Sequence, residues 1–195
     1  PNTESFNFVI RSWTRCRNEN VVDRVENIVR LMTDYGDTTD KQVQPNEKTY
    51  AMLLDAMSVR VKLRVNQQKE STNDDKIDEV LDRIEQMRMT LGSIAHQCDA
   101  SLTTSLHNTL IAAWSHAAEV NSKAPYEAEH LLQSMETAPD SFSYLLVMRS
   151  WQRSQHSNRA ERVLWWLSKQ KDDAETLSRL DLYPTVECFN AVIRT

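Results

Sequence analysis

The stretch LHNTLIAAW, residues 106–114, decides the fold because the chain repeats its pattern of apolar residues. Leu110 and Ile111 follow His107 at three and four residues, and a tryptophan follows at seven. Spacings of three, four and seven place side chains on one face of an α-helix. The same spacing, headed by an aromatic residue, recurs at 5–13, 49–57 and 143–151, and a shortened copy begins at residue 188. These stretches predict five helices that each bury one face.

A second pattern follows each complete copy of the first. It consists of a small or β-branched residue, an aliphatic residue four positions later and Met or Leu seven positions later. It occurs at 25–32, 80–87, 128–135 and 160–167. This spacing again marks one helix face. Because the two patterns alternate, the sequence predicts an all-helical chain with nine helices, arranged as four antiparallel pairs and one single helix.

Helix starts are marked in four of the five copies by a proline followed by a capping side chain. The prolines are Pro1, Pro45, Pro139 and Pro184, the residues after them are Asn2, Asn46, Asp140 and Thr185, and the third copy has Leu102 in the place of the proline. Proline is tolerated where a helix begins, and Asn, Asp and Thr are favoured N-caps. These starts divide the chain into repeats of about 1–44, 45–101, 102–138 and 139–183, with a partial repeat at 184–195. Since the pattern runs up to both ends, we expect a fragment of a longer protein.

Composition excludes several classes of protein. Among the 195 residues, 40% are hydrophobic and 26% are charged, which is ordinary for a folded domain. No apolar run approaches the ~18 residues of a membrane span. Cys16, Cys98 and Cys188 are far apart and form no CxxC pair, which disfavours a zinc site or a disulfide framework. No nucleophile elbow or phosphate-binding glycine loop occurs. We therefore expect no active site, cofactor or metal within these residues.

The motif Pro-Asn-x-x-Thr-Tyr at 45–50, followed by paired aliphatics and then by the second pattern, resembles the pentatricopeptide repeat family. The resemblance covers essentially the whole chain. Tetratricopeptide repeats have a similar length, but they carry a glycine in the first helix that is absent here. The resemblance implies a right-handed α-solenoid whose first helices line a groove for single-stranded RNA. It also implies a mitochondrial or plastid protein that functions in RNA processing.

Base-reading residues also follow from the resemblance, since the family reads one base per repeat through the fifth and last residues. In the first repeat these are Asn7 and Asn46, a pair that the family uses for pyrimidines, cytidine preferentially. In the third they are Asn108 and Asp140, which resemble its uridine reader. Asn190 occupies the fifth position of the partial repeat. Arg15, His116 and Arg153 share the position where the family commonly has a lysine that faces the RNA phosphates.

The chain also departs from the family pattern. The second repeat pairs Ala51 with Thr103 and the fourth pairs Leu145 with Thr185, and neither Ala nor Leu can form a hydrogen bond to a base. A valine at the second position normally sandwiches the base, but that position holds Glu4, Lys48, Ser105, Phe142 and Glu187. We therefore expect the segment alone to recognise RNA with little specificity.

Charge is divided unevenly between the two kinds of helix. The formal net charge of the chain is −5, which disfavours a general nucleic-acid binder. The first-helix stretches 2–17, 45–64, 101–119 and 140–155 nevertheless hold nine Lys and Arg against five Asp and Glu. They therefore carry +4, and the rest of the chain carries −9. A groove lined by first helices would attract phosphates better than the remaining surface.

Structural explanations compete with several of these assignments. Trp13, Trp114 and Trp151 could stack on bases, but their shared position favours burial between helices. The Asn residues could simply be polar residues of a first helical turn, and the Arg residues could be solvated. Of the adjacent Trp165 and Trp166, one should be buried and the other exposed.

Three functions remain open at this point. The leading one is an RNA-binding module that holds a transcript or presents it to a partner. The second is a non-catalytic scaffold for protein partners, favoured by the silent repeats and the acidic balance. The third is the substrate-binding half of an RNA-processing enzyme similar to the protein-only ribonuclease P group, which would need a nuclease domain outside these residues.

Overall fold

The computed structural model describes residues 2–16, 20–38, 43–68, 75–94, 100–175 and 182–193. Within them the chain forms nine helices and no strand, so the all-helical prediction is confirmed for the described residues. The helices are α1 (Thr3–Thr14), α2 (Val21–Thr38), α3 (Glu47–Gln68), α4 (Asp75–Ile94), α5 (Ala100–Ala117), α6 (Ala124–Ser134), α7 (Ser141–Arg153), α8 (Ser157–Glu175) and α9 (Val186–Ile193). Pro1 and Cys98 lie outside the described residues, and Cys16 and Cys188 are free thiols.

Capping side chains start α1, α3 and α7 as predicted. The Asn2 amide oxygen accepts a hydrogen bond from the Ser5 backbone N–H at 2.9 Å. Asn46 accepts one from the Thr49 N–H at 3.1 Å, and Asp140 accepts one from the Ser143 N–H at 2.8 Å. Each bond satisfies a backbone donor that the first helical turn leaves without an intrahelical partner.

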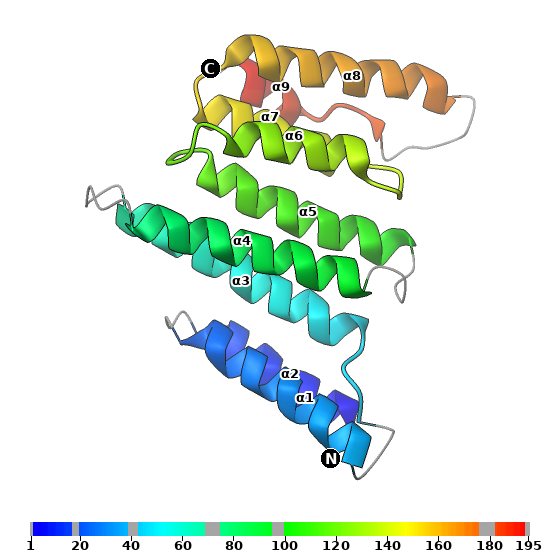
Figure 1. Cartoon of the computed structure of the whole chain (residues 1–195). Helices are drawn as coiled ribbons and strands as arrows, with labels where there is room; N and C mark the ends of the chain where they lie inside the picture. The colour runs from blue at the N-terminus through cyan, green and yellow to red at the C-terminus, as the bar shows by residue number, and fades with distance from the viewer. Residues whose placement is uncertain are drawn as a thin grey trace.

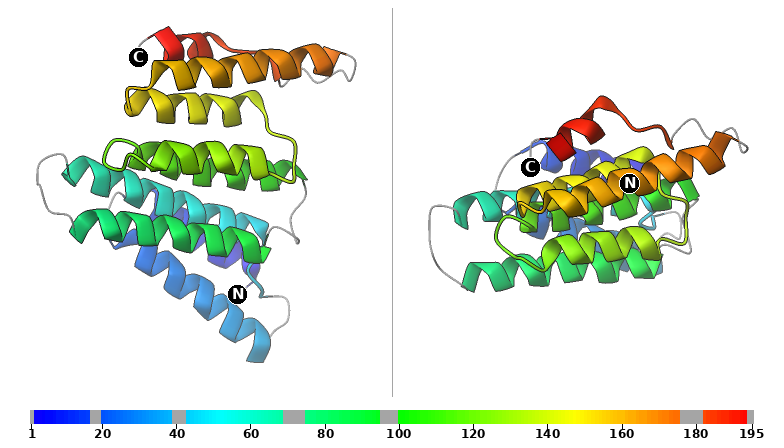
Figure 2. Two further views of the ribbon diagram at one scale, coloured as in Figure 1. Left: turned by 45° about the horizontal axis from the view of Figure 1, so that its top comes forward. Right: turned by 90° about the horizontal axis from the view of Figure 1, so that it is seen from above.

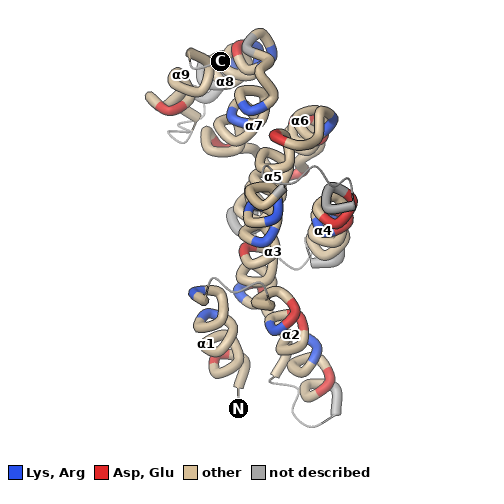
Figure 3. The backbone as a smooth tube through the Cα atoms, turned by 90° about the vertical axis from the view of Figure 1, so that its left-hand side faces the viewer, with Lys and Arg blue, Asp and Glu red and all other residues tan. Residues whose placement is uncertain are grey.

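The helices stack in order along the chain, with the two termini at opposite ends of the molecule (Figure 1). Each odd-numbered helix contacts the next odd-numbered one, from α1 with α3 to α7 with α9. Each also contacts the even-numbered helix that follows it, and the chain reverses direction between them (Figure 2). Seen from the side in Figure 3, α1, α3, α5 and α7 form one layer, and α2, α4 and α6 lie beside them. The arrangement is helical and repeat-like.

The apolar faces form the core, with one correction at each end. The predicted pairs Leu53–Leu54, Leu110–Ile111 and Val147–Met148 are buried. Val9 in α1 and Ile193 in α9 are instead 44% and 78% exposed. The reason is their place in the stack, since α1 and α9 are the outermost odd-numbered helices and have an odd-numbered neighbour on one side only. The prediction that both members of every pair are buried is therefore wrong for these helices.

The tryptophans behave as the structural explanation expected. Trp151 is completely buried, and Trp13 and Trp114 are half-buried against the core. Trp166 packs on the core while its neighbour Trp165 is 60% exposed. No described helix is both long enough and apolar enough to cross a bilayer.

Candidate nucleic-acid interface

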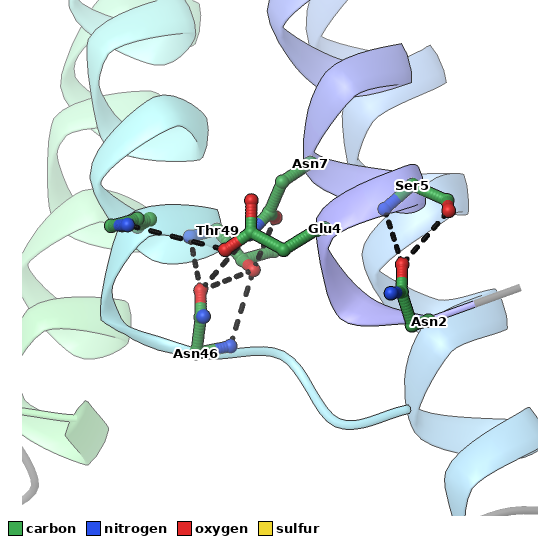
Figure 4. Close-up of polar contacts among 7 residues, drawn as sticks. Asn2, Glu4, Ser5, Asn7, Asn46 and Thr49 are labelled. Carbon is green, nitrogen blue, oxygen red and sulfur yellow. Dashed lines mark hydrogen bonds and ion pairs between the residues drawn. The ribbon is translucent and has the colours of Figure 1, made fainter. Parts of the chain in front are cut away.

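Asn7 of α1 lies against Asn46, the residue that caps α3 (Figure 4). The Asn7 amide nitrogen donates a hydrogen bond to the Asn46 side-chain oxygen at 3.2 Å. The Thr49 hydroxyl donates to the Asn7 amide oxygen at 2.6 Å. Asn7 is buried and Asn46 is exposed. The structure therefore brings together the two residues predicted to read a base in the first repeat, and it gives them a second role in joining α1 to α3.

Asn108 of α5 and Asp140, the cap of α7, repeat this arrangement. The Asn108 amide nitrogen donates to Asp140 Oδ1 at 3.2 Å, and the same oxygen caps α7. Asn108 is only 6% exposed, and its amide oxygen has no hydrogen-bond partner. Rotating the amide by 180° would place its oxygen against a carboxylate oxygen, so the hydrogen bond fixes the orientation. A buried acceptor without a donor is costly, and a ligand with an N–H group could satisfy it.

A cavity of about 440 Å³ lies beside this second pair. Asn108, Asp140, Asp55 of α3 and the ring of Phe142 are among the residues that line it. Phe142 is half-exposed, so a planar group could stack on it. Burial raises the pKa of the Asp55 carboxyl. Sequence reasoning missed Asp55, because an acid directly after the aliphatic pair has no counterpart in the other repeats, which have Arg11, Ala112 and Arg149 there.

The remaining base-reading positions form no such pair. Asn190 is exposed beside a cavity of about 240 Å³ between α7 and α9. Leu145 is buried in the core, and Ala51 is half-buried. The structure therefore brings together the predicted residues of the first and third repeats, and it leaves the second and fourth without a polar pair.

Charged residues at the second position form ion pairs between neighbouring first helices. Lys48 Nζ lies 4.0 Å from Glu4 Oε1, which links α1 to α3. Arg149 donates to Glu187 at 2.6 Å, which links α7 to α9. The contacts between helices account for the charged residues Glu4, Lys48 and Glu187 at these positions. A ligand that entered at either place would have to displace an exposed ion pair, which costs little.

The three residues predicted to face the RNA phosphates differ in whether other protein groups already bind them. Arg15 is exposed at the end of α1. Arg153 donates to the Ser115 carbonyl and hydroxyl, and it forms an ion pair with Glu119 at 3.3 Å. Burial, together with the charges of Arg153 and Lys62, lowers the pKa of His116 to about 4. His116 is therefore neutral at physiological pH and would offer a phosphate a hydrogen bond rather than a charge.

Lys62 of α3 is a cation that sequence reasoning did not single out. Its side chain is exposed, and its charge acts on His116 of the next first helix. The repeat pattern did not mark it because Val59 holds the equivalent position in α3 and the lysine falls three residues later. Lys62, His116 and Arg153 therefore bring basic groups from α3, α5 and α7 close together.

We expect His116 to make stability depend on pH. Its pKa is 6.5 in the unfolded chain and about 4 in the folded one, so the unfolded state binds the proton first. The contribution is complete above pH 6.5 and is lost as the pH falls towards 4. After allowance for solvent screening, the free energy of unfolding should fall by about 1 kcal/mol between pH 7 and pH 5. Urea denaturation at both pH values measures this.

His116→Gln should remove that part of the pH dependence, whereas His130→Gln, at an exposed position, should retain it. The interpretation fails if wild type and His116→Gln lose the same stability between the two pH values.

Comparison with known proteins gives no assignment. No family model, curated protein or solved structure matches this chain.

Proposed function

We propose that this chain is a pentatricopeptide-type array, a right-handed α-solenoid with repeats at about 1–44, 45–101, 102–138 and 139–183 and a partial repeat from 184. We propose that it binds single-stranded RNA along the groove lined by α1, α3, α5 and α7, as part of an organelle protein of RNA metabolism. The observation that carries the proposal is the recurrence of one polar pair, Asn7 with Asn46 and Asn108 with Asp140, at equivalent places between successive first helices.

The chemistry of the third repeat fits a uracil base. The Asn108 oxygen has no hydrogen-bond partner but is buried, and it would accept the N3–H of uracil once the Asn108 side chain turned toward the cavity. The ring of Phe142 offers a face for stacking. Uracil carries carbonyl oxygens on both sides of N3–H, so the Asn108 amide nitrogen would have to be shared between Asp140 and one of them. The first pair has two amides and would accept either pyrimidine.

Basic residues give the RNA backbone a path along the same helices. Arg15, Lys62 and Arg153 lie on first helices, and the stretches that contain these helices carry +4 against −9 elsewhere. Binding should therefore weaken steeply with salt. Because two reading repeats are separated by a silent one, the isolated segment should bind weakly, and a longer array would bind more tightly.

The test is Asn108→Thr with Asp140 retained. In the family's logic this change moves the third repeat from uridine towards guanosine. Competition binding with RNAs that differ only at the facing base should show the ratio of the two affinities changing by about fivefold or more, the lower end of what one base contact gives. Asn27→Thr, an exposed position on α2, is the matched control and should leave the ratio unchanged.

Two results would count against the proposal in different ways. If RNA binds but the ratio does not move, the assignment of Asn108 as a base reader is wrong. If no RNA binds at low salt, the second candidate, a scaffold for protein partners, takes over. That candidate is favoured by the burial of Leu145 and by the ion pairs that occupy the second positions.

A further inference from the structure

A further cavity of interest lies outside the predicted interface, between α4 and α6, and α5 also lines it. Its volume is about 790 Å³, within the range of ligand-binding sites. Leu91, Leu110, Leu131 and Trp114 form its apolar part. A surface of this size that combines leucines with a half-buried indole is suited to an apolar side chain from a partner.

The charged groups around the cavity are mainly acidic. Glu85, Glu127 and Glu136 line it, and Arg88 is the only Lys or Arg among the lining residues. Arg88 is already bound, because its guanidinium donates to both oxygens of Glu85 at 2.8 and 2.5 Å. Neither Glu127 nor Glu136 forms an ion pair with a described Lys or Arg. Glu127 and Glu136 are exposed and thus face the cavity without an ion pair to a described Lys or Arg, although the charge of Glu127 acts on Arg88 and helps to raise its pKa.

We propose that the cavity between α4 and α6 is a docking site for a partner polypeptide, and that it takes a segment in which arginine alternates with leucine-like side chains. The arginine would meet the carboxylates of Glu127 and Glu136 and the ring of Trp114, because a guanidinium combines with both carboxylates and indole faces. The neighbouring apolar side chain would occupy the leucine-lined part. An RNA strand is a poor occupant because its phosphates would meet the carboxylates.

This site is independent of the proposed RNA groove. The cavity is lined by α4, α5 and α6, and its lining residues include no member of the polar pairs Asn7–Asn46 and Asn108–Asp140. One chain could therefore hold RNA and a protein partner together. The acidic charge of the second helices and loops would then serve to bind a basic protein partner, a role that RNA binding does not explain.

The test uses NMR titration of the whole chain with a capped pentapeptide, leucine–arginine–leucine–arginine–leucine. The indole N–H resonance of Trp114, assigned with Trp114→Phe, reports on the cavity. We expect a saturable shift with the arginine peptide. The same peptide with citrulline, which keeps the shape of arginine but has no charge, should bind about fivefold more weakly, since exposed ion pairs each contribute only a few-fold.

The variant Glu127→Gln plus Glu136→Gln should weaken the arginine peptide about fivefold and leave the citrulline peptide unchanged. Glu161→Gln plus Asp82→Asn removes the same charge from exposed positions outside the cavity and should bind like wild type. The proposal is overturned if no saturable shift occurs or if the arginine and citrulline peptides bind equally. It is also overturned if a single-stranded RNA, rather than the peptide, shifts the Trp114 resonance.

Discussion

Replacing Trp151 with alanine is expected to lower the free energy of unfolding by about 3–5 kcal/mol. The Trp151 side chain is completely buried in α7. Its indole N–H donates to Glu129 Oε2 at 2.8 Å. The ring of Tyr126 packs edge-to-face against the indole, with 4.8 Å between the ring centroids. The substitution would leave a cavity and would also remove one hydrogen bond to the buried Glu129 carboxylate, whose other oxygen accepts from Arg162. Urea denaturation followed by far-UV circular dichroism measures the effect.

Trp165→Ala is the matched control because it removes the same side chain from an exposed position on α8. Trp165 is 60% exposed and contacts Lys169 through its ring. Its loss should cost less than about 1 kcal/mol. Equal destabilisation by the two variants would show that α6, α7 and α8 do not pack around Trp151 as described.

The two glycines of the chain should respond to alanine in opposite directions. A Cβ on Gly36 in α2 would overlap the backbone oxygen of Val43 and the side chain of Gln44. We expect Gly36→Ala to destabilise the fold by about 1–3 kcal/mol, because the overlap outweighs the helix propensity of alanine. A Cβ on Gly92 in α4 would meet no atom within 4 Å. Gly92→Ala should therefore stabilise the fold by up to about 1 kcal/mol.

Thermal and urea denaturation of both variants checks this pair. A stabilising effect of Gly36→Ala would mean that the segment after α2 does not pass as close to that helix as the structure has it. A destabilising effect of Gly92→Ala would mean that its helix position is less open than described.

The elements of the fold could be predicted from the sequence because each helix carries its own local pattern. The spacing around His107 fixes α5, and the capping oxygens of Asn2, Asn46 and Asp140 fix where α1, α3 and α7 begin. Burial could not be predicted fully from the pattern. Val9 occupies the same position as Leu53, but its exposure depends on which neighbours α1 has, and a local spacing does not contain that information.

For the candidate interface, the sequence suggested which residues to consider but not their contacts. Asn108 and Asp140 lie 32 positions apart, and only the packing of α5 against α7 shows that one donates to the other. The neutral state of His116 likewise could not be predicted from the sequence, because it results from burial and from the charges of Arg153 and Lys62. Lys62 and Asp55 were missed since they belong to one repeat only.

The division of the core into two clusters has a consequence for how the molecule unfolds. One cluster joins α1 to α6 and the other joins α5 to α9, and among the described residues only Trp114 and Leu131 are partly buried side chains that pack against both. A stack of this kind loses cooperativity where few side chains bridge neighbouring units. Slow amide exchange should therefore divide into two protected blocks that meet at α5 and α6, and a lesion in one block should leave the protection of the other largely intact.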